Sequence, residues 1–422
     1  MSRIVFLEPP FGLFMASLDA PFSLMYLAGI AEQCGWEAQI VDMQTLNDKI
    51  PDADIYAVTS TSPQFPTTIK LSQRLDNEFP ETPKIIGGPH ISAEPDDLSK
   101  TNFNIGVLGE GENTLAKLLL HPEQIANSTC VKIHGIGIEN LDEIPFPARH
   151  LIDWSKYKRG IYWGNEKLAS AVGIISSRGC PHNCCFCGSH VVFGRRVRFR
   201  SIENVIAEIK QVKSTMDYRG FGFFDDTFCL NKNRVYSLCE EFAKLDIVWR
   251  CLSRVDTVDK KILASMWDSG CKEIILGFES GNQQILNNLQ KGVTVEQNLR
   301  AMKLVKESGI QLKIGIIVGS PGETWESIKD TMKLLRECPP DFWNVSVFTP
   351  YPGGAVWANP EKYKIKLLTR DLNQFIMVGK DFKGNVVVET EKMNKKDIEQ
   401  ARDEMIDLML EIAPQNEVVQ NV

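Results

Sequence analysis

The sequence has no apolar run that could span a lipid bilayer, for which about 20 consecutive apolar residues are needed. The longest candidate near the start, Ala20 to Ala31, is too short, and the acidic residues and prolines before it make a poor signal peptide. An excess of positive charge is also missing, because 54 acidic residues exceed 47 lysines and arginines. These absences predict a cytoplasmic protein with no transmembrane segment and no general affinity for nucleic acid.

Repeats and low-complexity segments are absent too, which argues against a solenoid and against a largely disordered chain. The composition is that of a globular protein, with 43% hydrophobic and 24% charged residues. A chain of 422 residues exceeds what one hydrophobic core usually organises. We therefore expect two or three domains.

The cysteines lack the spread of a disulfide framework. There are eleven, an odd number, and four of them crowd within eight residues, at Cys180, Cys184, Cys185 and Cys187. This crowding predicts a metal site in a reducing compartment.

The first 120 residues alternate short apolar runs with amphipathic stretches, which is typical of strands and helices in turn. Such alternation implies right-handed crossovers and a doubly wound, flavodoxin-like parallel sheet over residues 1–134. A ligand is expected in the loops at the carboxyl ends of the strands, Thr59 to Ser62, Gly87 to His90 and Gly109 to Glu112. The predicted strands are Arg3 to Glu8, Glu37 to Met43, Ile55 to Ser60, Lys84 to Gly87 and Ile105 to Leu108, and the predicted helices are Phe22 to Cys34, Thr67 to Asn77 and Asn113 to Leu120.

A second α/β series follows residues 135–168, where periodicity fades and a linker is predicted. Six strand-and-helix units over residues 169–356 are two short of a TIM barrel, so we expect a partial, open β/α barrel. Residues 357–422 are predicted to form a small helical extension, with a hairpin at Lys383 to Asn385 and a helix from Lys395 to Ile412. The predicted barrel strands are Ala171 to Ser176, Gly220 to Phe224, Val248 to Ser253, Glu273 to Phe278, Leu312 to Val318 and Asn344 to Thr349.

The cysteine cluster comes directly after the first barrel strand. Cys180, Cys184 and Cys187 stand at positions i, i+4 and i+7, so three thiolates on one loop can hold three corners of an iron-sulfur cubane. A zinc knuckle and merely buried cysteines are the alternatives, although a structural zinc would need a fourth ligand from elsewhere. With an aromatic residue, Phe186, before its last cysteine, the motif resembles the signature of the radical S-adenosylmethionine (SAM) superfamily.

The resemblance implies a 4Fe-4S cluster held by Cys180, Cys184 and Cys187, with one iron open for the amino and carboxylate groups of SAM. An electron from the cluster would cleave the sulfonium and release a 5'-deoxyadenosyl radical. Cys185 lies outside the spacing and is interpreted as a structural or redox spectator.

Motifs at the later strand ends are similar to the SAM-binding half of the same superfamily. In this interpretation Arg254 pairs with the SAM carboxylate, Glu279 accepts hydrogen bonds from the ribose with Ser280 beside it, and the adenine is framed near Phe186 and Gly319. Taken singly, the motifs are also compatible with helix caps and turns. The implied SAM-binding residues are Phe186, Asp225, Asp226, Arg254, Glu279, Ser280, Gly319 and Pro350.

An α/β domain before such a barrel resembles the radical SAM enzymes that carry an N-terminal cobalamin-binding domain. The connector Leu141 to Ala148 is also similar to that of the family. Small residues at the strand ends would let a planar corrin and its nucleotide tail approach the backbone. The implied cobalamin contacts are Ser23, Leu24, Thr59, Ser60, Thr61, Ser62, Gly87, Gly88, Pro89, His90, Gly109, Glu110 and Gly111.

The Asp-x-His-x-x-Gly motif of many cobalamin proteins is missing, because none of the six histidines has an aspartate two residues before it. Either cobalt has no protein ligand, as the resemblance allows, or the domain has lost cobalamin and is structural. His90 is therefore expected to shape its loop.

A basic run leaves two interpretations open, a solvated loop or a contact with a carboxylate or phosphate of the substrate. It consists of Arg195, Arg196, Arg198 and Arg200.

The resemblance implies an anaerobic methyltransferase that acts on an unactivated carbon or a phosphinate of a small metabolite, lipid or natural-product intermediate, with a reductant such as flavodoxin or ferredoxin. One SAM would methylate cobalamin, and another would supply the radical that abstracts hydrogen from the substrate. The alternatives are a radical cyclase or rearrangement enzyme, similar to the anaerobic cyclase of magnesium porphyrin synthesis, and a non-catalytic cobalamin-binding regulator. The regulator would leave the cysteine motif unexplained.

Overall fold

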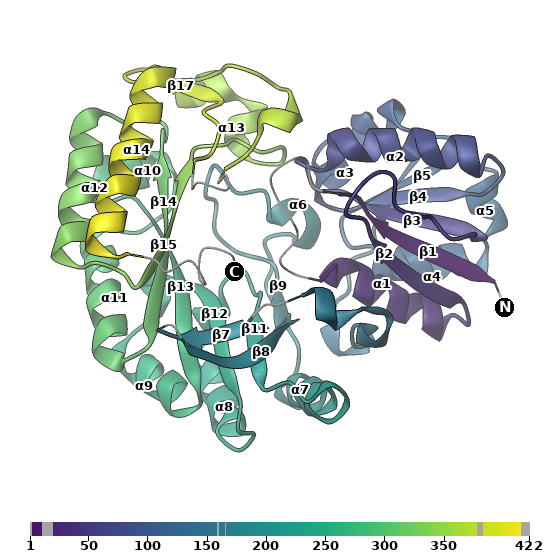
Figure 1. Cartoon of the computed structure of the whole chain (residues 1–422), viewed down its shortest axis with the longest axis horizontal. Coiled ribbons are helices and arrows are strands. Elements are labelled where there is room, and N and C mark those ends of the chain that lie inside the picture. Colours follow the sequence, from purple (N-terminus) through teal and green to yellow (C-terminus); the bar gives the residue numbers. More distant parts are fainter. Residues whose placement is uncertain (1, 11–19, 158–159, 165, 378–382, 415–422) are drawn as a thin grey trace.

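The computed structural model describes residues 2–10, 20–157, 160–164, 166–377 and 383–414. Two lobes lie side by side, an N-terminal α/β domain and a larger barrel lobe (Figure 1). Within the described ranges no helix is both long and apolar enough to cross a membrane.

The N-terminal sheet has six parallel strands in the order β2-β1-β3-β4-β5-β6, which is the flavodoxin-like order with one strand added. Alternate residues of β1 enter two different cores: Ile4 and Phe6 pack under α1 and α4, whereas Val5 and Leu7 pack under α2 and α3. The predicted doubly wound fold is confirmed. The elements are β1 Arg3–Glu8, α1 Phe22–Gln33, β2 Glu37–Asp42, β3 Ile55–Thr59, α2 Phe65–Glu78, β4 Lys84–Gly87, α3 Pro89–Ala93, β5 Ile105–Leu108, α4 Glu112–Leu120, α5 Glu123–Ala126 and β6 Val131–His134.

The second sheet confirms the partial barrel. Six parallel strands follow one another in chain order, and β7 adds an antiparallel strand beside the first of them. This extra strand lies within the range predicted as a linker. The strands are β7 Gly160–Trp163, β8 Glu166–Ile174, β11 Gly220–Phe223, β12 Val248–Arg254, β13 Cys271–Glu279, β14 Gln311–Val318 and β15 Phe342–Val347.

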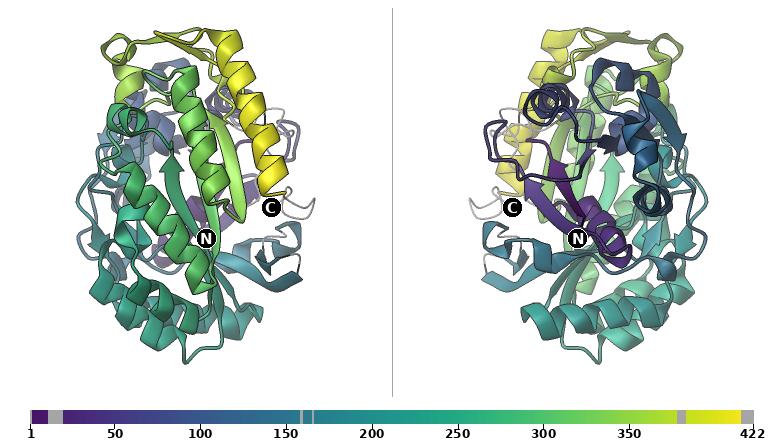
Figure 2. Two further views of the ribbon diagram at one scale, coloured as in Figure 1. Left: turned by 90° about the vertical axis from the view of Figure 1, so that its left-hand side faces the viewer. Right: turned by 90° about the vertical axis from the view of Figure 1, so that its right-hand side faces the viewer.

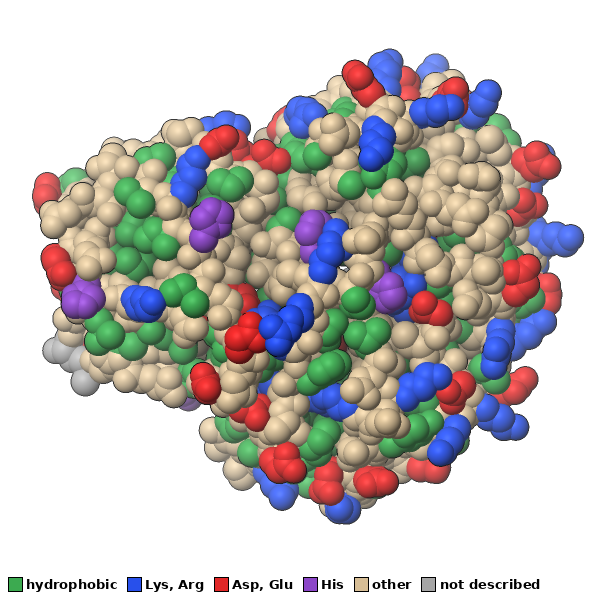
Figure 3. All heavy atoms as spheres, turned by 180° about the vertical axis from the view of Figure 1, so that it is seen from behind, with side chains coloured by type: hydrophobic (Ala, Val, Ile, Leu, Met, Phe, Trp, Pro, Cys, Tyr) green, Lys and Arg blue, Asp and Glu red, His purple; other side chains and the backbone are tan. Residues whose placement is uncertain are grey.

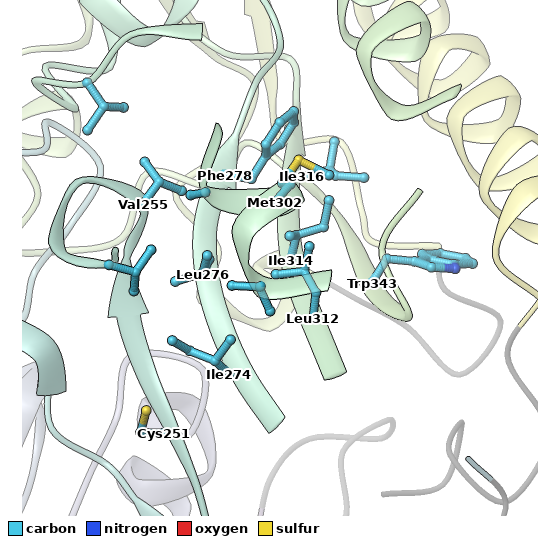
Figure 4. Close-up of a cluster of buried hydrophobic side chains, with 14 of the residues drawn as sticks. Cys251, Val255, Ile274, Leu276, Phe278, Met302, Leu312, Ile314, Ile316 and Trp343 are labelled. Atoms are coloured by element: carbon cyan, nitrogen blue, oxygen red, sulfur yellow. The ribbon is translucent and has the colours of Figure 1, made fainter. Parts of the chain in front are cut away.

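The barrel helices begin at side-chain caps, because a short polar side chain before each helix accepts a hydrogen bond from an early backbone N–H. Thr294 caps α11 and Thr324 caps α12, both in a capping box. Side chains of β13 and β14 pack against Met302 of α11 (Figure 4). The helices are α7 Ile202–Met216, α8 Lys232–Phe242, α9 Lys260–Asp268, α10 Gln283–Asn288, α11 Val295–Ser308 and α12 Trp325–Glu337.

Two glycines leave the barrel-interior face of β13 and β14 without side chains at one position of each strand. Gly277 of β13 pairs with Gly315 of β14 in the parallel ladder, while Leu276 and Ile314 on either side of them enter the helix-facing core. Because successive side chains of a strand alternate between faces, the glycines leave space on the barrel interior. At Gly277 this space is taken by two side chains, because a Cβ there would lie 2.5 Å from Lys291 Nζ and 2.8 Å from Glu279 Oε1.

The C-terminal extension comprises α13 Ala355–Ala358, an antiparallel pair of β16 Ile365–Leu367 with β17 Val388–Thr390, and α14 Lys395–Ile412. The predicted hairpin at Lys383 to Asn385 is wrong in its details, because these residues lie in the long connection between β16 and β17. Helix α14 lies alongside α12 (Figure 2), and Trp343 Nε1 donates a hydrogen bond to the Ala413 carbonyl at 2.9 Å.

Candidate functional site

The cysteine-bearing segment is a loop held at both ends. Strands β9 Ser177–Arg178 and β10 Arg198–Phe199 pair antiparallel and bracket residues 179–197, which we call the cluster loop. Gly179 has a φ of +95°, and a Cβ there would collide with the Arg196 carbonyl, so only glycine suits the entry to the loop. A short helix, α6 His190–Phe193, follows the cysteines.

The three predicted cluster ligands are free, half-buried thiols in this loop. Burial raises the pKa of the Cys184 thiol, and the charges of Lys291 and Arg254 oppose that rise. Nearby cations favour the thiolate form that ligates metal. Each sulfur has a polar side-chain contact: Thr227 Oγ1 lies 3.9 Å from the Cys180 sulfur, Ser189 Oγ 3.3 Å from that of Cys187 and Arg254 Nη1 4.0 Å from that of Cys184.

The donor set fits a cubane better than a single ion. Among the described residues, no three His, Cys, Asp or Glu side chains converge closely enough to hold one metal ion. A cubane places each thiolate on a different iron, so its ligands need not converge. A cavity of about 580 Å³ is lined by Cys184 and Cys187, and His182 Nε2 in the same loop is buried without a hydrogen-bond partner. Room and an unsatisfied polar group both suit an added cofactor.

Cys185 has a different environment. Its thiol is 1% exposed and lies 3.5 Å from the Asn288 carbonyl, and its backbone N–H donates to Leu289 at 3.0 Å. Burial raises the pKa of Cys185 to about 12, which disfavours the thiolate. These contacts support the interpretation of Cys185 as a structural residue.

Glu279 stands at the end of β13 in a strained backbone conformation. Its φ of +63° is unusual for a residue with a side chain, and the ladder to β14 is irregular between Gly277 and Glu279. The carboxylate pairs with Lys291 at 2.7 Å, and both side chains are buried. Sequence reasoning missed Lys291, which stands outside the motifs at the strand ends.

Arg254 is fixed by two groups and faces the cluster loop with its third nitrogen. Its Nε and Nη2 each lie 3.0 Å from the Asp256 carboxylate, and Nη2 also donates to the Lys291 carbonyl at 2.8 Å. Its Nη1 lies 4.0 Å from the Cys184 sulfur. The structure therefore brings Arg254, Lys291 and Glu279 together beside the cysteines.

The paired aspartates after β11 have different roles. Asp225 is buried, and its carboxylate accepts three hydrogen bonds of 2.6 Å, two from Ser176 and one from Ser177. These bonds commit Asp225 to holding the chain just before the cluster loop, and its contact with SAM stays a prediction. Asp226 is exposed, and its pKa is raised by desolvation and by the charge of Asp225.

The remaining predicted SAM residues make mostly local contacts. Ser280 is buried with its hydroxyl 3.2 Å from Thr331 Oγ1. The Gly319 amide donates to the buried Glu323 carboxylate at 2.6 Å, so it is not free to frame adenine by hydrogen bonding. Pro350 is buried before the Tyr351 to Gly354 loop, and that loop reaches the cluster loop because a Cβ on Gly354 would lie 3.1 Å from the Phe186 carbonyl.

The predicted cobalamin loops gather at the carboxyl edge of the N-terminal sheet and face the barrel lobe. A Cβ added at Gly109 would lie 3.7 Å from the Val192 carbonyl in α6, and one at Gly353 would lie 3.3 Å from the Cβ of Ala93, the last residue of α3. Helices α3 and α6 are in contact. The two predicted cofactor regions therefore adjoin.

Polar side chains in the first of these loops bond one another. The hydroxyls of Ser60 and Thr68 are 2.9 Å apart, and Thr61 Oγ1 donates to Gln64 Oε1 at 2.7 Å. Ser62 Oγ lies 3.1 Å from Nδ1 of His90. These bonds shape the loop, and its backbone is also engaged, because Ser60 N–H donates to the Gly87 carbonyl and the Ser60 carbonyl accepts from His90 N–H.

His90 does have an aspartate partner, which sequence spacing did not reveal. Its Nε2 lies 3.1 Å from Asp97, seven residues later, while its ring stacks on Phe65 with centroids 3.9 Å apart. Burial lowers the pKa of His90 to about 4, so the ring is neutral near pH 7. Both ring nitrogens are engaged, which supports a role in shaping the loop.

Two predicted cobalamin residues have a structural explanation instead. Leu24 is 1% exposed within the core under α1, whereas its neighbour Ser23 is exposed.

Gly88 has a φ of +98°, and a Cβ there would lie 2.7 Å from Thr59 Oγ1 and 2.9 Å from the Ser60 nitrogen. A Cβ on Gly87 would make only ordinary contacts, 3.6 Å from the Val107 carbonyl. Gly88 is thus required by the loop itself, while Pro89 begins α3.

Glu110 and Glu112 form a buried ion network with the cluster loop. Arg178 lies 2.8 Å from Glu110 and 2.6 Å from Glu112, and Arg198 lies 2.7 Å from Glu110. All four side chains are less than a tenth exposed. Glu110 therefore joins the two lobes, and the Gly109 and Gly111 backbones remain the cobalamin candidates in this loop.

Two arginines of the basic run fit neither predicted interpretation, because they pair with buried carboxylates of the chain itself. Arg198 is paired as above, and Arg200 forms an ion pair with buried Glu208. Arg196 pairs with Glu139 at 2.7 Å on the exposed surface, and Arg195 lines the 580 Å³ cavity. Seen from behind, Lys or Arg and His side chains lie near the junction of the lobes (Figure 3).

Two family profiles match the chain. That of the Radical SAM superfamily matches residues 174–335, and that of the B12 binding domain matches residues 19–119. A curated relative, an uncharacterised methyltransferase of Pyrococcus horikoshii, is 30% identical over 372 residues, which are 83% of this chain and 78% of the relative. The anaerobic magnesium-protoporphyrin IX monomethyl ester cyclase of Rubrivivax gelatinosus is 29% identical over 83% of this chain and 68% of its own length.

The fold is also similar to a solved structure. A radical SAM methyltransferase from Kitasatospora setae, with cobalamin and a 4Fe-4S cluster bound, matches with a TM-score of 0.69 at 15% identity. The match covers 99% of this chain and 90% of that chain, so both lobes share the arrangement.

Proposed function

We propose that this chain, which belongs to the cobalamin-dependent radical SAM enzymes, transfers a methyl group from SAM to an unactivated carbon or a phosphinate of a small molecule. Family membership confirms the predicted enzyme class and its cofactors, a 4Fe-4S cluster, SAM and cobalamin. The observation that carries the methyl transfer is the buried contact between the two cofactor regions, because Arg178 links Glu110 and Glu112 to the cluster loop.

In this proposal Cys180, Cys184 and Cys187 hold three irons of the cluster, and the backbones near Gly109 and Gly111 support cobalamin. When bound, the cluster and SAM supply hydrogen-atom abstraction from the substrate, and cobalamin supplies a transferable methyl group.

The residues of the chain bind and orient SAM. Arg254 is already fixed by Asp256, so its free Nη1 can meet the SAM carboxylate with little loss of side-chain entropy. Glu279 projects from strained backbone beside the side-chain-free Gly277 and Gly315, a place suited to ribose hydroxyls. Lys291 fixes the position of the Glu279 carboxylate through the ion pair at 2.7 Å.

Radical cyclisation is the second candidate, and it is favoured by the similarity to the protoporphyrin ester cyclase reported above. Both reactions begin with hydrogen abstraction. They differ in the fate of a second SAM, which loses its methyl group only in the transfer reaction.

The products of SAM separate the two candidates. Anaerobically purified protein with cobalamin and its cluster is incubated with a reductant and methyl-labelled SAM, and the two nucleoside products are quantified. We expect 5'-deoxyadenosine together with S-adenosylhomocysteine. Deoxyadenosine alone would favour cyclisation, and neither product, with an intact cluster, would favour a regulator.

The electron donor and the location also belong to the proposal. A low-potential protein such as flavodoxin or ferredoxin would reduce the cluster. A cytoplasmic location suits thiolate ligands, because that compartment keeps thiols reduced.

A further inference from the structure

The 580 Å³ cavity is built from three distant parts of the chain. The N-terminal domain contributes Ala93 and Glu94, and the cluster loop contributes Cys184, Cys187 and other residues. The C-terminal part contributes Trp357 and Arg370, among others. Its volume is within the range of small-molecule pockets, which is about 300 to 1,000 Å³.

Two guanidinium groups line this cavity without a carboxylate partner in the described part of the chain. Arg195 donates to the His182 carbonyl, and Arg370 lies over the Trp357 ring at 4.4 Å from its centroid. Glu94 also lines the cavity and accepts a hydrogen bond of 2.6 Å from Trp357 Nε1, so two arginines face one carboxylate there.

The unpaired state of these two arginines sets them apart from their neighbours. Arg196, Arg198 and Arg200 all pair with carboxylates. Two unneutralised cations in a concave site favour an anion, and the aromatic stack on Trp357 holds one of them in place before binding.

We propose that Arg195 and Arg370 bind an acidic group, a carboxylate or a phosphate, of the methyl acceptor. The cavity is next to two predicted cluster ligands, so a substrate held there lies beside the reaction centre. None of the predicted SAM-binding residues lines the cavity. That the bound acid belongs to the methyl acceptor rests on the proposed function, whereas the binding of an anion by the two arginines does not.

Binding of simple probes tests the subsite without turnover. Cluster-loaded protein saturated with SAM is titrated calorimetrically with benzoate, phenyl phosphate and uncharged benzyl alcohol. We expect at least one anion to bind at least tenfold more tightly than the alcohol, and the tighter of the two anions identifies the acidic group.

Variants locate the binding. Arg195→Gln and Arg370→Gln should each weaken anion binding about tenfold, since each removes a charge-assisted contact. Arg370→Lys should keep part of the affinity. Arg219→Gln, an exposed arginine 3.1 Å from Asp246, is the matched control and should bind as wild type. Cluster absorbance and circular dichroism report that each variant is folded.

Three outcomes would overturn the inference: equal binding of anions and alcohol, wild-type anion affinity in both glutamine variants, or a loss of SAM affinity in Arg370→Gln. The last would assign the cations to the SAM carboxylate. Anion binding in a protein that forms no S-adenosylhomocysteine would instead retain the subsite and refute methyl transfer.

Discussion

Adjacent residues of the cluster loop have opposite environments. Cys184 lines the cavity beside Arg254, whereas Cys185 is buried with its thiol against the Asn288 carbonyl. Exposure and nearby cations favour a metal-ligating thiolate, and burial among apolar groups favours a neutral thiol. Neighbouring cysteines can therefore serve chemistry and packing separately.

The cluster ligands are tested by single substitutions. Cys180→Ala, Cys184→Ala or Cys187→Ala should abolish the iron-sulfur absorbance and SAM cleavage after reconstitution, because a cubane cannot be held at three corners by two thiolates. Cys185→Ala should keep both and cost about 1 kcal/mol of stability. Loss of iron in Cys185→Ala alone would show that the ligand assignment is wrong.

The cobalt coordination is tested at His90. Because Ser62 and Asp97 engage both ring nitrogens, we expect no histidine on cobalt. The paramagnetic resonance spectrum of bound cob(II)alamin should be the same in wild type and His90→Ala. Nitrogen hyperfine structure that disappears in the variant would identify His90 as the lower ligand.

His90 also predicts a pH dependence of stability. Burial lowers its pKa to about 4 in the fold, below the usual 6.5 of histidine, so the unfolded chain binds the proton more readily. The contribution of the neutral, buried ring to the free energy of unfolding is fully present above pH 6.5. As the pH falls toward 4, the free energy of unfolding decreases by up to about 3 kcal/mol. Denaturant unfolding at several pH values should show a shallower dependence in His90→Asn. Identical slopes would argue against a buried, neutral histidine.

At the scale of elements, β13 and β14 pair through two glycines, Gly277 and Gly315, whose surroundings differ. A Cβ on Gly277 would lie 2.5 Å from Lys291 Nζ and 2.8 Å from Glu279 Oε1, whereas one on Gly315 would come no closer than 3.9 Å to Glu279. The absence of a side chain at Gly277 therefore leaves space for the ion pair of Glu279 and Lys291 at the end of β13. A side chain at Gly315 would not collide with this ion pair.

The two glycines form a matched pair of substitutions. Gly277→Ala should displace the Glu279 and Lys291 side chains and weaken SAM binding about tenfold, while the cluster remains. Gly315→Ala should change the SAM affinity by less than about twofold, because its new methyl group makes an ordinary contact. Calorimetric titration of cluster-loaded protein measures both. Equal losses in the two variants would contradict a role for the Glu279 pair in SAM binding.

At the scale of the whole molecule, one buried arginine joins the lobes. Arg178 lies in β9, the strand that precedes the cluster loop, and its two carboxylate partners belong to the N-terminal domain. Its guanidinium also lies 5.5 Å from the Tyr26 ring centroid and 5.1 Å from that of Phe193. Because the network is buried, movement of one lobe away from the other would expose its charged groups to water or leave them buried without a partner.

Removing this arginine should loosen the lobes. Arg178→Met leaves Glu112 buried without its cation, a loss of about 3 to 5 kcal/mol. We expect the N-terminal domain of the variant to unfold first in calorimetry, whereas the wild-type lobes unfold together. The exposed control Arg219→Met should cost at most about 1 kcal/mol. An unchanged melting profile in Arg178→Met would show that the network does not couple the lobes.

The sequence by itself determined the two α/β series, the order of their strands along the chain and the three-cysteine spacing. These are local properties, since hydrophobic periodicity and ligand spacing are written within one element or one loop. The short edge strand Val131–His134 was missed because it is mostly exposed and only four residues long.

Only the tertiary structure decided which polar groups face a ligand and which hold the fold. Asp225 was predicted to touch SAM but bonds Ser176 and Ser177, and His90 found its aspartate seven residues away. The partners of Arg178 stand 66 and 68 residues before it. Local patterns carry no information on such pairings, because they arise only when strand ends meet in three dimensions.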